Sequence, residues 1–445
     1  MLGKEKALGL LESAVVESPA QETEIRLLGS SSFLTRYSDN YIHQNVGETG
    51  CTVDARAVNS KRIGSASINQ VDAESLARVV QQAHEISHII PETPHFVGLP
   101  EAEDAQEVEG GFFDSTRTCP PDLRAAYVDR VIAMAREKGV KVAGALSTET
   151  LEMAVANSNG VRAYTAQTRA SLTCVAMSAD SSGYAEEYAS DVATVDPTRV
   201  AERAIGKCLL SRNPVSIPPG EYPVILEPGA VSSMLMFMAF LGMTAESYQE
   251  GRSFMSGSLG QKIVDDSITI WDDGHDPAGF PMPFDFEGVP KRKVMLVDRG
   301  IAAGVVYGSL AASKEGKKST GHAISQMMFS GSMPANLFMA GGDSSVEKMI
   351  ASTKRGVLVT RFHYVNPVHP KRAVITGMTR DGTFLIEDGK VARGVKNLRF
   401  TESILGALSR VESISAQREI SGGFLPVVCP AIKVNGFNFT GSTEF

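Results

Sequence analysis

The sequence predicts an α+β fold, with an N-terminal α/β domain at residues 1–212 and a mostly-β C-terminal domain at residues 213–445. Three observations support this prediction. The first half alternates amphipathic helical segments with strand-like segments, whereas short apolar runs separated by turns dominate the second half. Between them, residues 211–223 contain four prolines and a glycine, a composition typical of a linker. A chain of 445 residues is long enough for two or three domains.

Helical periodicity in the first half predicts four helices, at residues 4–17, 72–90, 120–138 and 197–210. Asp72 is a suitable N-cap for the second of them, and Pro91 ends it. The third begins at Pro120 and ends just before Gly139, the usual asymmetry of helix ends.

Strand-like segments fill the gaps between these helices. Alternating or β-branched residues predict strands at 22–28, 35–46 and 51–69, the last interrupted by a turn at 60–62. Two further strands are expected on either side of Asn159-Gly160, a dipeptide suited to a type I′ hairpin turn.

The second half is expected to form a mixed, barrel-like sheet. Turn signals at Asp298-Arg299-Gly300, Asp381-Gly382 and Asp388-Gly389 separate its short apolar runs. Residues 231–243, VSSMLMFMAFLGM, contain four methionines and no charge, which predicts a buried helix. Thirteen residues are too few to span a bilayer, which takes about 20 residues.

Composition restricts the class of protein. The net charge is −8, without a basic stripe, which argues against nucleic-acid binding. The five cysteines are widely spaced and form no C-x-x-C pair, as expected for reduced thiols rather than disulfides or structural zinc. Neither a signal peptide nor a long apolar segment is recognisable, so we expect a cytoplasmic protein without membrane association.

One motif in the first half resembles a metal site. Residues 84–88 read H-E-x-x-H, a spacing that places His84 and His88 on one helix face with Glu85 as general base, and His95 is a candidate third ligand. The apolar stripe of this helix, however, leaves both histidines on its flank and Glu85 nearly opposite. We therefore favour an exposed polar face, and His84 and His88 as decoys, over a self-sufficient metallopeptidase, which stays open as an alternative.

Residues 284–323 read FDFEGVPKRKVMLVDRGIAAGVVYGSLAASKEGKKSTGHA and resemble the TldD/PmbA family, once labelled modulators of DNA gyrase. Further matches follow in the same order along nearly the whole chain, at residues 35–46, 62–69, 219–228, 379–391 and 429–441. The resemblance implies an N-terminal α/β domain and a mostly-β C-terminal domain, assembled as dimers or heterodimers.

TldD-like members of this family are metallopeptidases that bind a metal through an H-E-x-x-x-H helix and a later cysteine. Aligned on Gly242, the two histidine positions of that motif are Met238 and Met243 in this chain, and the glutamate position is Ala239. A thioether is a poor ligand for a borderline dication and alanine accepts no proton. The later cysteine has no clear counterpart, because Cys429 belongs to a different motif.

The resemblance is therefore to the TldE/PmbA-like branch, which lacks the metal motif. It implies a non-catalytic subunit that binds no metal and pairs with a TldD-like metallopeptidase, the zinc or similar dication belonging to the partner. We expect peptides or unfolded segments as substrates, a possible homodimer, and no activity from this chain alone. His322, Arg361 and His363 are candidates for lining a substrate groove. A non-enzymatic peptide-binding or regulatory protein is a further alternative.

Overall fold

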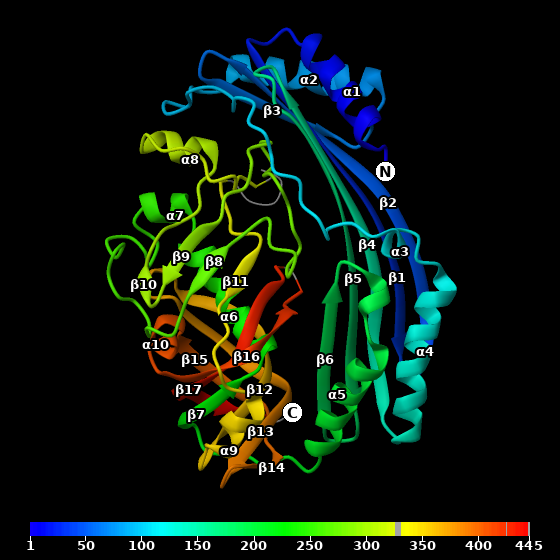
Figure 1. The fold of residues 1–445 in the computed structure, drawn as a ribbon, viewed down its shortest axis with the longest axis vertical. Coiled ribbons are helices and arrows are strands. Elements are labelled where there is room, and N and C mark those ends of the chain that lie inside the picture. Colours follow the sequence, from blue (N-terminus) through cyan, green and yellow to red (C-terminus); the bar gives the residue numbers. More distant parts are fainter. Residues whose placement is uncertain (325–330, 424, 444–445) are drawn as a thin grey trace.

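The computed structural model describes residues 1–324, 331–423 and 425–443, and two large sheets dominate it (Figure 1). One sheet is built from residues 22–189 and the other from residues 220–442. Helices together with mixed and antiparallel sheets confirm the predicted α+β fold. The limits of 1–212 and 213–445 as separate domains stay a prediction.

The first sheet is antiparallel throughout, in the order β3-β2-β1-β4-β5-β6. Its longest strand has 19 residues, so it extends for roughly 60 Å at about 3.3 Å per residue. The strands are β1 (Glu22–Ser38), β2 (Tyr41–Asn59), β3 (Arg62–Ile68), β4 (Lys141–Asn157), β5 (Arg162–Met177) and β6 (Ser182–Ala189).

Two pairs of helices cover one face of this sheet, one pair near each end (Figure 1). They are α1 (Lys4–Val16) with α2 (Ala73–Ile89), and α4 (Pro121–Glu137) with α5 (Pro197–Leu210). Asp72 caps α2 by accepting a hydrogen bond of 2.9 Å from the Ser75 amide, as predicted. Glycines allow close packing: a Cβ at Gly64 or Gly183 would lie 2.0 or 2.2 Å from a carbonyl oxygen of α2 or α5.

Two sequence-based expectations about turns are wrong. Residues 35–46 do not form one strand, because Asp39 and Asn40 adopt φ of 50° and 63° and turn the chain between β1 and β2. Asn159-Gly160 does not form a type I′ turn, since only Gly160 of the pair has positive φ. Instead, Asn157 Oδ1 accepts hydrogen bonds from the Asn159 and Val161 amides, and this side chain closes a longer loop.

The second sheet contains eleven strands in the main order β10-β9-β8-β11-β17-β15-β13-β12-β7. Because β7 also pairs with β17, the strands β7, β12, β13, β15 and β17 close on themselves, so the expected barrel-like arrangement is present. The strands are β7 (Gly220–Leu226), β8 (Ile270–Asp272), β9 (Val294–Asp298), β10 (Ile301–Ala302), β11 (Leu337–Met339), β12 (Arg355–His369), β13 (Val374–Glu387), β14 (Lys390–Gly394), β15 (Leu398–Ser403), β16 (Val411–Ser421) and β17 (Val427–Ser442).

The principal helix of this half is α6 (Pro228–Gly242), which packs against β12, β16 and β17. The other described helices are short: α3 (Asp114–Arg117), α7 (Ala245–Gln249), α8 (Ser309–Lys314), α9 (Val346–Ala351) and α10 (Ile404–Leu408). In the described ranges, every helix falls short of the length and apolarity that crossing a membrane requires.

Candidate functional site

Helix α6 contains the positions that the sequence aligns with a metal motif. The side chains of Met238, Ala239 and Met243 are fully buried in the main core of the C-terminal half. Gly242 packs directly on Phe254, because a Cβ there would lie 2.2 Å from the aromatic ring. The aligned positions are therefore enclosed by apolar atoms, which thioether and methyl groups tolerate and an unpaired imidazole or carboxylate would not.

Cys429 does not complete a site at these positions. Its thiol donates a hydrogen bond of 3.5 Å to the carbonyl oxygen of Pro228, at the start of α6. Met238 lies ten residues further on, which corresponds to about 15 Å along a helix. Burial raises the pKa of the Cys429 thiol well above its ordinary value, so the sulfur stays protonated and is a poor ligand.

The H-E-x-x-H residues lie on the outer side of α2. Glu85 and His88 are exposed and His84 is half-buried, as helical periodicity predicts. The two Nε2 atoms are 3.2 Å apart, and Nδ1 of His84 is 3.0 Å from Nδ2 of Asn59. Within the described ranges, no group of three or more His, Cys, Asp or Glu side chains is arranged to hold a metal ion.

In the described ranges, His95 makes no recorded contact with His84 or His88. It lies in the loop after α2, where its carbonyl oxygen accepts a hydrogen bond of 2.6 Å from the Ser313 hydroxyl of α8. Glu85 accepts a hydrogen bond of 2.9 Å from Gln81, one turn earlier on the same helix. That His84 and His88 are decoys stays a prediction.

His322 is fully buried, unlike a residue that lines an open groove. Its Nε2 atom lies 2.7 Å from Oδ1 of Asp272, and its Nδ1 lies 2.9 Å from the Thr320 hydroxyl. Asp272 in turn accepts a hydrogen bond of 2.7 Å from the Asn336 amide. This geometry favours a structural role for His322 over the groove role that the sequence suggests.

Arg361 and His363 lie two residues apart on β12, in a different network. Arg361 binds Asp381, with an Nε to Oδ2 distance of 3.0 Å, and its guanidinium lies 3.9 Å from the ring centroid of Tyr184 on β6. His363 packs edge-on against Tyr364. Burial, with Arg380 and Arg361 nearby, lowers the pKa of His363. The three groove candidates therefore do not form one group: His322 is fixed beside β8, and Arg361 joins the two sheets.

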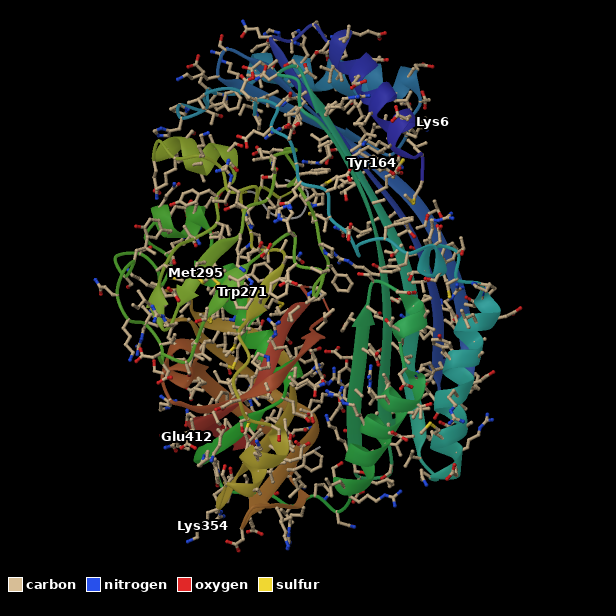
Figure 2. The ribbon with its side chains drawn as sticks, viewed as in Figure 1. Lys6, Tyr164, Trp271, Met295, Lys354 and Glu412 are labelled. Atoms are coloured by element: carbon tan, nitrogen blue, oxygen red, sulfur yellow. The ribbon has the colours of Figure 1, made fainter. Side chains whose placement is uncertain are left out.

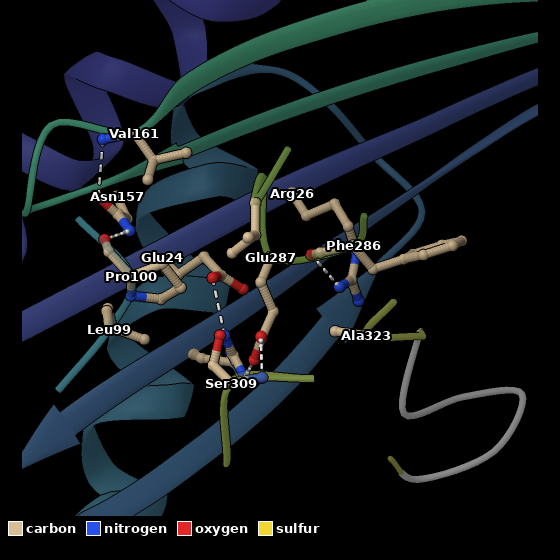
Figure 3. Close-up of polar contacts among 12 residues, drawn as sticks. Glu24, Arg26, Leu99, Pro100, Asn157, Val161, Phe286, Glu287, Ser309 and Ala323 are labelled. Atoms are coloured by element: carbon tan, nitrogen blue, oxygen red, sulfur yellow. Dashed lines mark hydrogen bonds and ion pairs between the residues drawn. The ribbon is translucent and has the colours of Figure 1, made fainter. Parts of the chain in front are cut away.

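A buried ion network also joins the two halves, as Figure 3 shows. Arg56 of β2 binds Glu24 at 2.7 Å and Glu287 at 3.0 Å, and Glu287 also accepts a hydrogen bond from the Ser309 amide. Beside it, Arg26 donates a hydrogen bond of 2.8 Å to the carbonyl oxygen of Phe286. The irregular segment around residue 287 is thus tied to the first sheet by charge-assisted bonds.

A pocket of about 520 Å³ lies between the sheets, and sequence reasoning did not find it. Its wall combines β1, β2, β4 and β5 with loops of the second half, including Phe280 and Met333. Figure 2 shows the side chains of both halves, with Tyr164 labelled on the first sheet and Trp271 and Met295 in the second half; none of these three residues lines the pocket. Residues so far apart in sequence carry no common motif, so only the fold brings them together.

Two family models match the chain. One, described as the PmbA/TldA metallopeptidase C-terminal domain, matches residues 219–441, and the other, described as the central domain, matches residues 116–211. Among curated proteins, "Metalloprotease PmbA" of Escherichia coli is 24% identical over 447 residues, 96% of this chain and 94% of that protein. A "Metalloprotease" of Methanothermobacter thermautotrophicus is 24% identical over 323 residues, 68% of this chain and 70% of that protein.

Solved structures show the same fold. The crystal structure of TldE from Thermococcus kodakarensis superposes with a TM-score of 0.89 at 23% identity, covering 97% of this chain and 99% of that one. The similarity extends over both sheets.

Proposed function

The chain belongs to the PmbA/TldD metallopeptidase family, and on that premise we propose that it is the metal-free, TldE/PmbA-like subunit of a heteromeric peptidase. A TldD-like partner would hold the zinc or similar dication and cleave peptides or unfolded segments. The observation that carries the proposal is the burial of Met238, Ala239 and Met243, on α6 and at its C-terminal end, in the hydrophobic core of the C-terminal half.

The side chains at these positions do not fit a metal. Zinc and similar dications are bound in proteins mainly by imidazole, thiolate and carboxylate groups, and the activation of a bound water requires a base. Thioether and methyl groups supply none of these at neutral pH, and Cys429 is protonated and lies at the far end of the helix. The contribution of this chain is then to bind and stabilise its partner and to form part of the substrate chamber.

We place the protein in the cytoplasm. All five cysteines are unpaired thiols. Four of them are buried, at Cys119, Cys174, Cys208 and Cys429, and such thiols suit a reducing compartment.

The test combines metal analysis with reconstitution. The purified chain should contain no stoichiometric metal and should not cleave an unfolded peptide, whereas co-expression with a TldD-like chain from the same source should give a stable complex with metal-dependent activity. The matched control replaces the motif glutamate of the TldD-like chain by glutamine, which should leave the complex intact and abolish cleavage. One metal per chain together with cleavage by this chain alone would refute the proposal.

The same samples test the non-enzymatic alternative. A peptide-binding or regulatory protein would bind unfolded peptides without a partner and would add nothing to the activity of a TldD-like chain. Only the lack of added activity, measured at equal concentrations of the two chains, would favour that alternative, because a non-catalytic subunit can also bind peptides without its partner.

A further inference from the structure

The pocket between the sheets is apolar over most of its wall. Its apolar lining includes Leu28, Leu151, Met153, Phe280, Met282 and Phe286. The pocket has a volume of about 520 Å³, which is enough for one or two amino-acid side chains of a ligand. Gln167 and Arg169 of β5 are among the polar residues of the wall, which also include Ser30, Thr52, Glu152 and Thr165.

Arg169 reaches the pocket as a cation with hydrogen-bonding capacity to spare. Its guanidinium lies 4.6 Å from the ring centroid of Phe280, and its buried Nε–H has no acceptor in the described ranges. Its cross-strand neighbour is Glu149, but the two side chains form no ion pair. Burial lowers the pKa of Arg169, and the nearby Glu149 carboxylate partly offsets this effect. An arginine guanidinium is still charged at neutral pH.

Gln167 lies two residues before Arg169, so both side chains project from the same face of β5. Its Nε2 atom donates to the carbonyl oxygen of Pro281, which fixes the amide, while Oε1 is buried without a donor. The residue is only 3% exposed. A buried acceptor without a partner is costly, and the same holds for the buried donor on Arg169.

We propose that this pocket binds the C-terminal residue of a peptide. The terminal carboxylate would accept from the Arg169 guanidinium, the last amide N–H would donate to Gln167 Oε1, and an apolar terminal side chain would fill the wall formed by Phe280, Met153 and Leu151. A peptide C-terminus is the simplest ligand that carries an acceptor anion, a neighbouring donor and an apolar group together. The inference rests on the proposed function for the presence of peptides, and it names the end of the peptide that this chain holds.

Calorimetric titration of the full chain with three small probes tests the assignment. N-acetylphenylalanine carries all three features, N-acetylphenylalaninamide lacks the carboxylate, and 3-phenylpropanoate lacks the amide N–H. We expect N-acetylphenylalanine to bind at least roughly tenfold more tightly than either of the others, because each loses one hydrogen bond to a buried group. Equal binding of the amide would overturn the role of Arg169. Equal binding of 3-phenylpropanoate would show a site for apolar carboxylates in general, such as fatty acids, and would overturn the assignment to a peptide terminus.

Variants provide a second readout. Arg169→Met should weaken N-acetylphenylalanine binding at least roughly tenfold while barely changing the binding of the amide, and Gln167→Met should abolish the preference over 3-phenylpropanoate. Arg162→Met is the matched control, an exposed arginine on the same strand, and should bind all probes as the unmodified chain does. If one pocket variant fails to fold, the other variant and the three probes still test whether the pocket binds a peptide C-terminus.

The outcome is separable from that of the proposed function, because the titration uses this chain without a partner and without turnover. A chain that distinguishes the probes but adds no activity to a TldD-like subunit refutes the subunit role alone. A chain that completes an active complex but binds the three probes equally refutes the carboxylate site alone.

Discussion

The Nε2 atom of His322 lies 2.7 Å from Oδ1 of Asp272, and neither side chain has exposed surface. Burial, reinforced by nearby Lys291, lowers the pKa of His322 despite the carboxylate. Burial raises the pKa of Asp272, but Lys291 and His322 more than compensate, so it lies below its ordinary value. The ring is held on both sides, because Nε2 faces the Asp272 carboxylate and Nδ1 lies 2.8 Å from the carbonyl oxygen of Thr320.

Because of the His322–Asp272 pair, we expect the free energy of unfolding to decrease in mild acid. Below about pH 6.5, His322 takes up a proton more readily in the unfolded chain than in the folded one, because its pKa is lowered on folding, so proton uptake favours unfolding. Its contribution to the slope is at most about 1.4 kcal/mol per pH unit. Urea unfolding between about pH 7.5 and about pH 5.5 should show a shallower pH dependence for His322→Gln than for the unmodified chain. His43→Gln, at an exposed position, should behave like the unmodified chain; equal slopes for all three would contradict the assignment.

Among single replacements in the ion network between the sheets, replacement of Arg56 should reduce the stability of the fold the most. Replacing it with methionine leaves the carboxylates of Glu24 and Glu287 buried without their cation, which costs about 3–5 kcal/mol. Urea unfolding followed by circular dichroism measures this loss. Lys141→Met breaks an exposed ion pair with Asp39 and should leave the midpoint unchanged. A change for Arg56→Met as small as that of the control would show that the network adds little stability.

Arg361 should behave as a structural residue rather than a substrate ligand. Arg361→Lys keeps the charge but loses the flat contact with Tyr184 and the forked bonding to Asp381, so we expect a loss of about 1–2 kcal/mol. In a reconstituted peptidase, the KM for an unfolded peptide should be the same for the variant and the unmodified chain when both are assayed at equal concentrations of folded protein. A raised KM with unchanged stability would instead support the groove role predicted from the sequence.

Local chemistry made the helices predictable, because Asp72, Pro120 and Gly139 mark helix ends whatever the tertiary structure. The turn at Asp39-Asn40 was missed since its flanking residues keep a strand-like pattern through it. The burial of His322 depends on Asp272, fifty residues earlier, and the pocket depends on the contact of β5 with Phe280, so neither follows from local pattern. The alignment of α6 with a metal motif rests on the family resemblance, whereas the burial of this helix agrees with its apolar composition.

The H-E-x-x-H motif on α2 gives a prediction about activity. Glu85 faces solvent and is bonded to Gln81, and the motif lacks the oriented second shell and enclosed cavity that a catalytic zinc site needs. Glu85→Gln should therefore leave the kcat of a reconstituted peptidase unchanged, as should the double variant His84→Gln/His88→Gln. Loss of activity in Glu85→Gln, with the complex still assembled, would show that this motif takes part in catalysis and would favour the metallopeptidase alternative.

Returning imidazoles to α6 should not restore a metal site. Met238→His/Met243→His places two polar rings among buried apolar side chains without designed partners, at a cost of about 1–3 kcal/mol for each unsatisfied group. The matched control Met238→Leu/Met243→Leu keeps volume and apolarity, and each substitution should cost less than about 1.5 kcal/mol. Thermal unfolding with and without zinc separates the outcomes, because a ligand that binds the folded state raises Tm. The histidine variant should have a lower Tm than the leucine variant. Zinc should not raise that Tm, since Cys429 lies at the other end of the helix. A zinc-dependent rise in Tm confined to the histidine variant would mean that α6 still retains the geometry of a working metal helix.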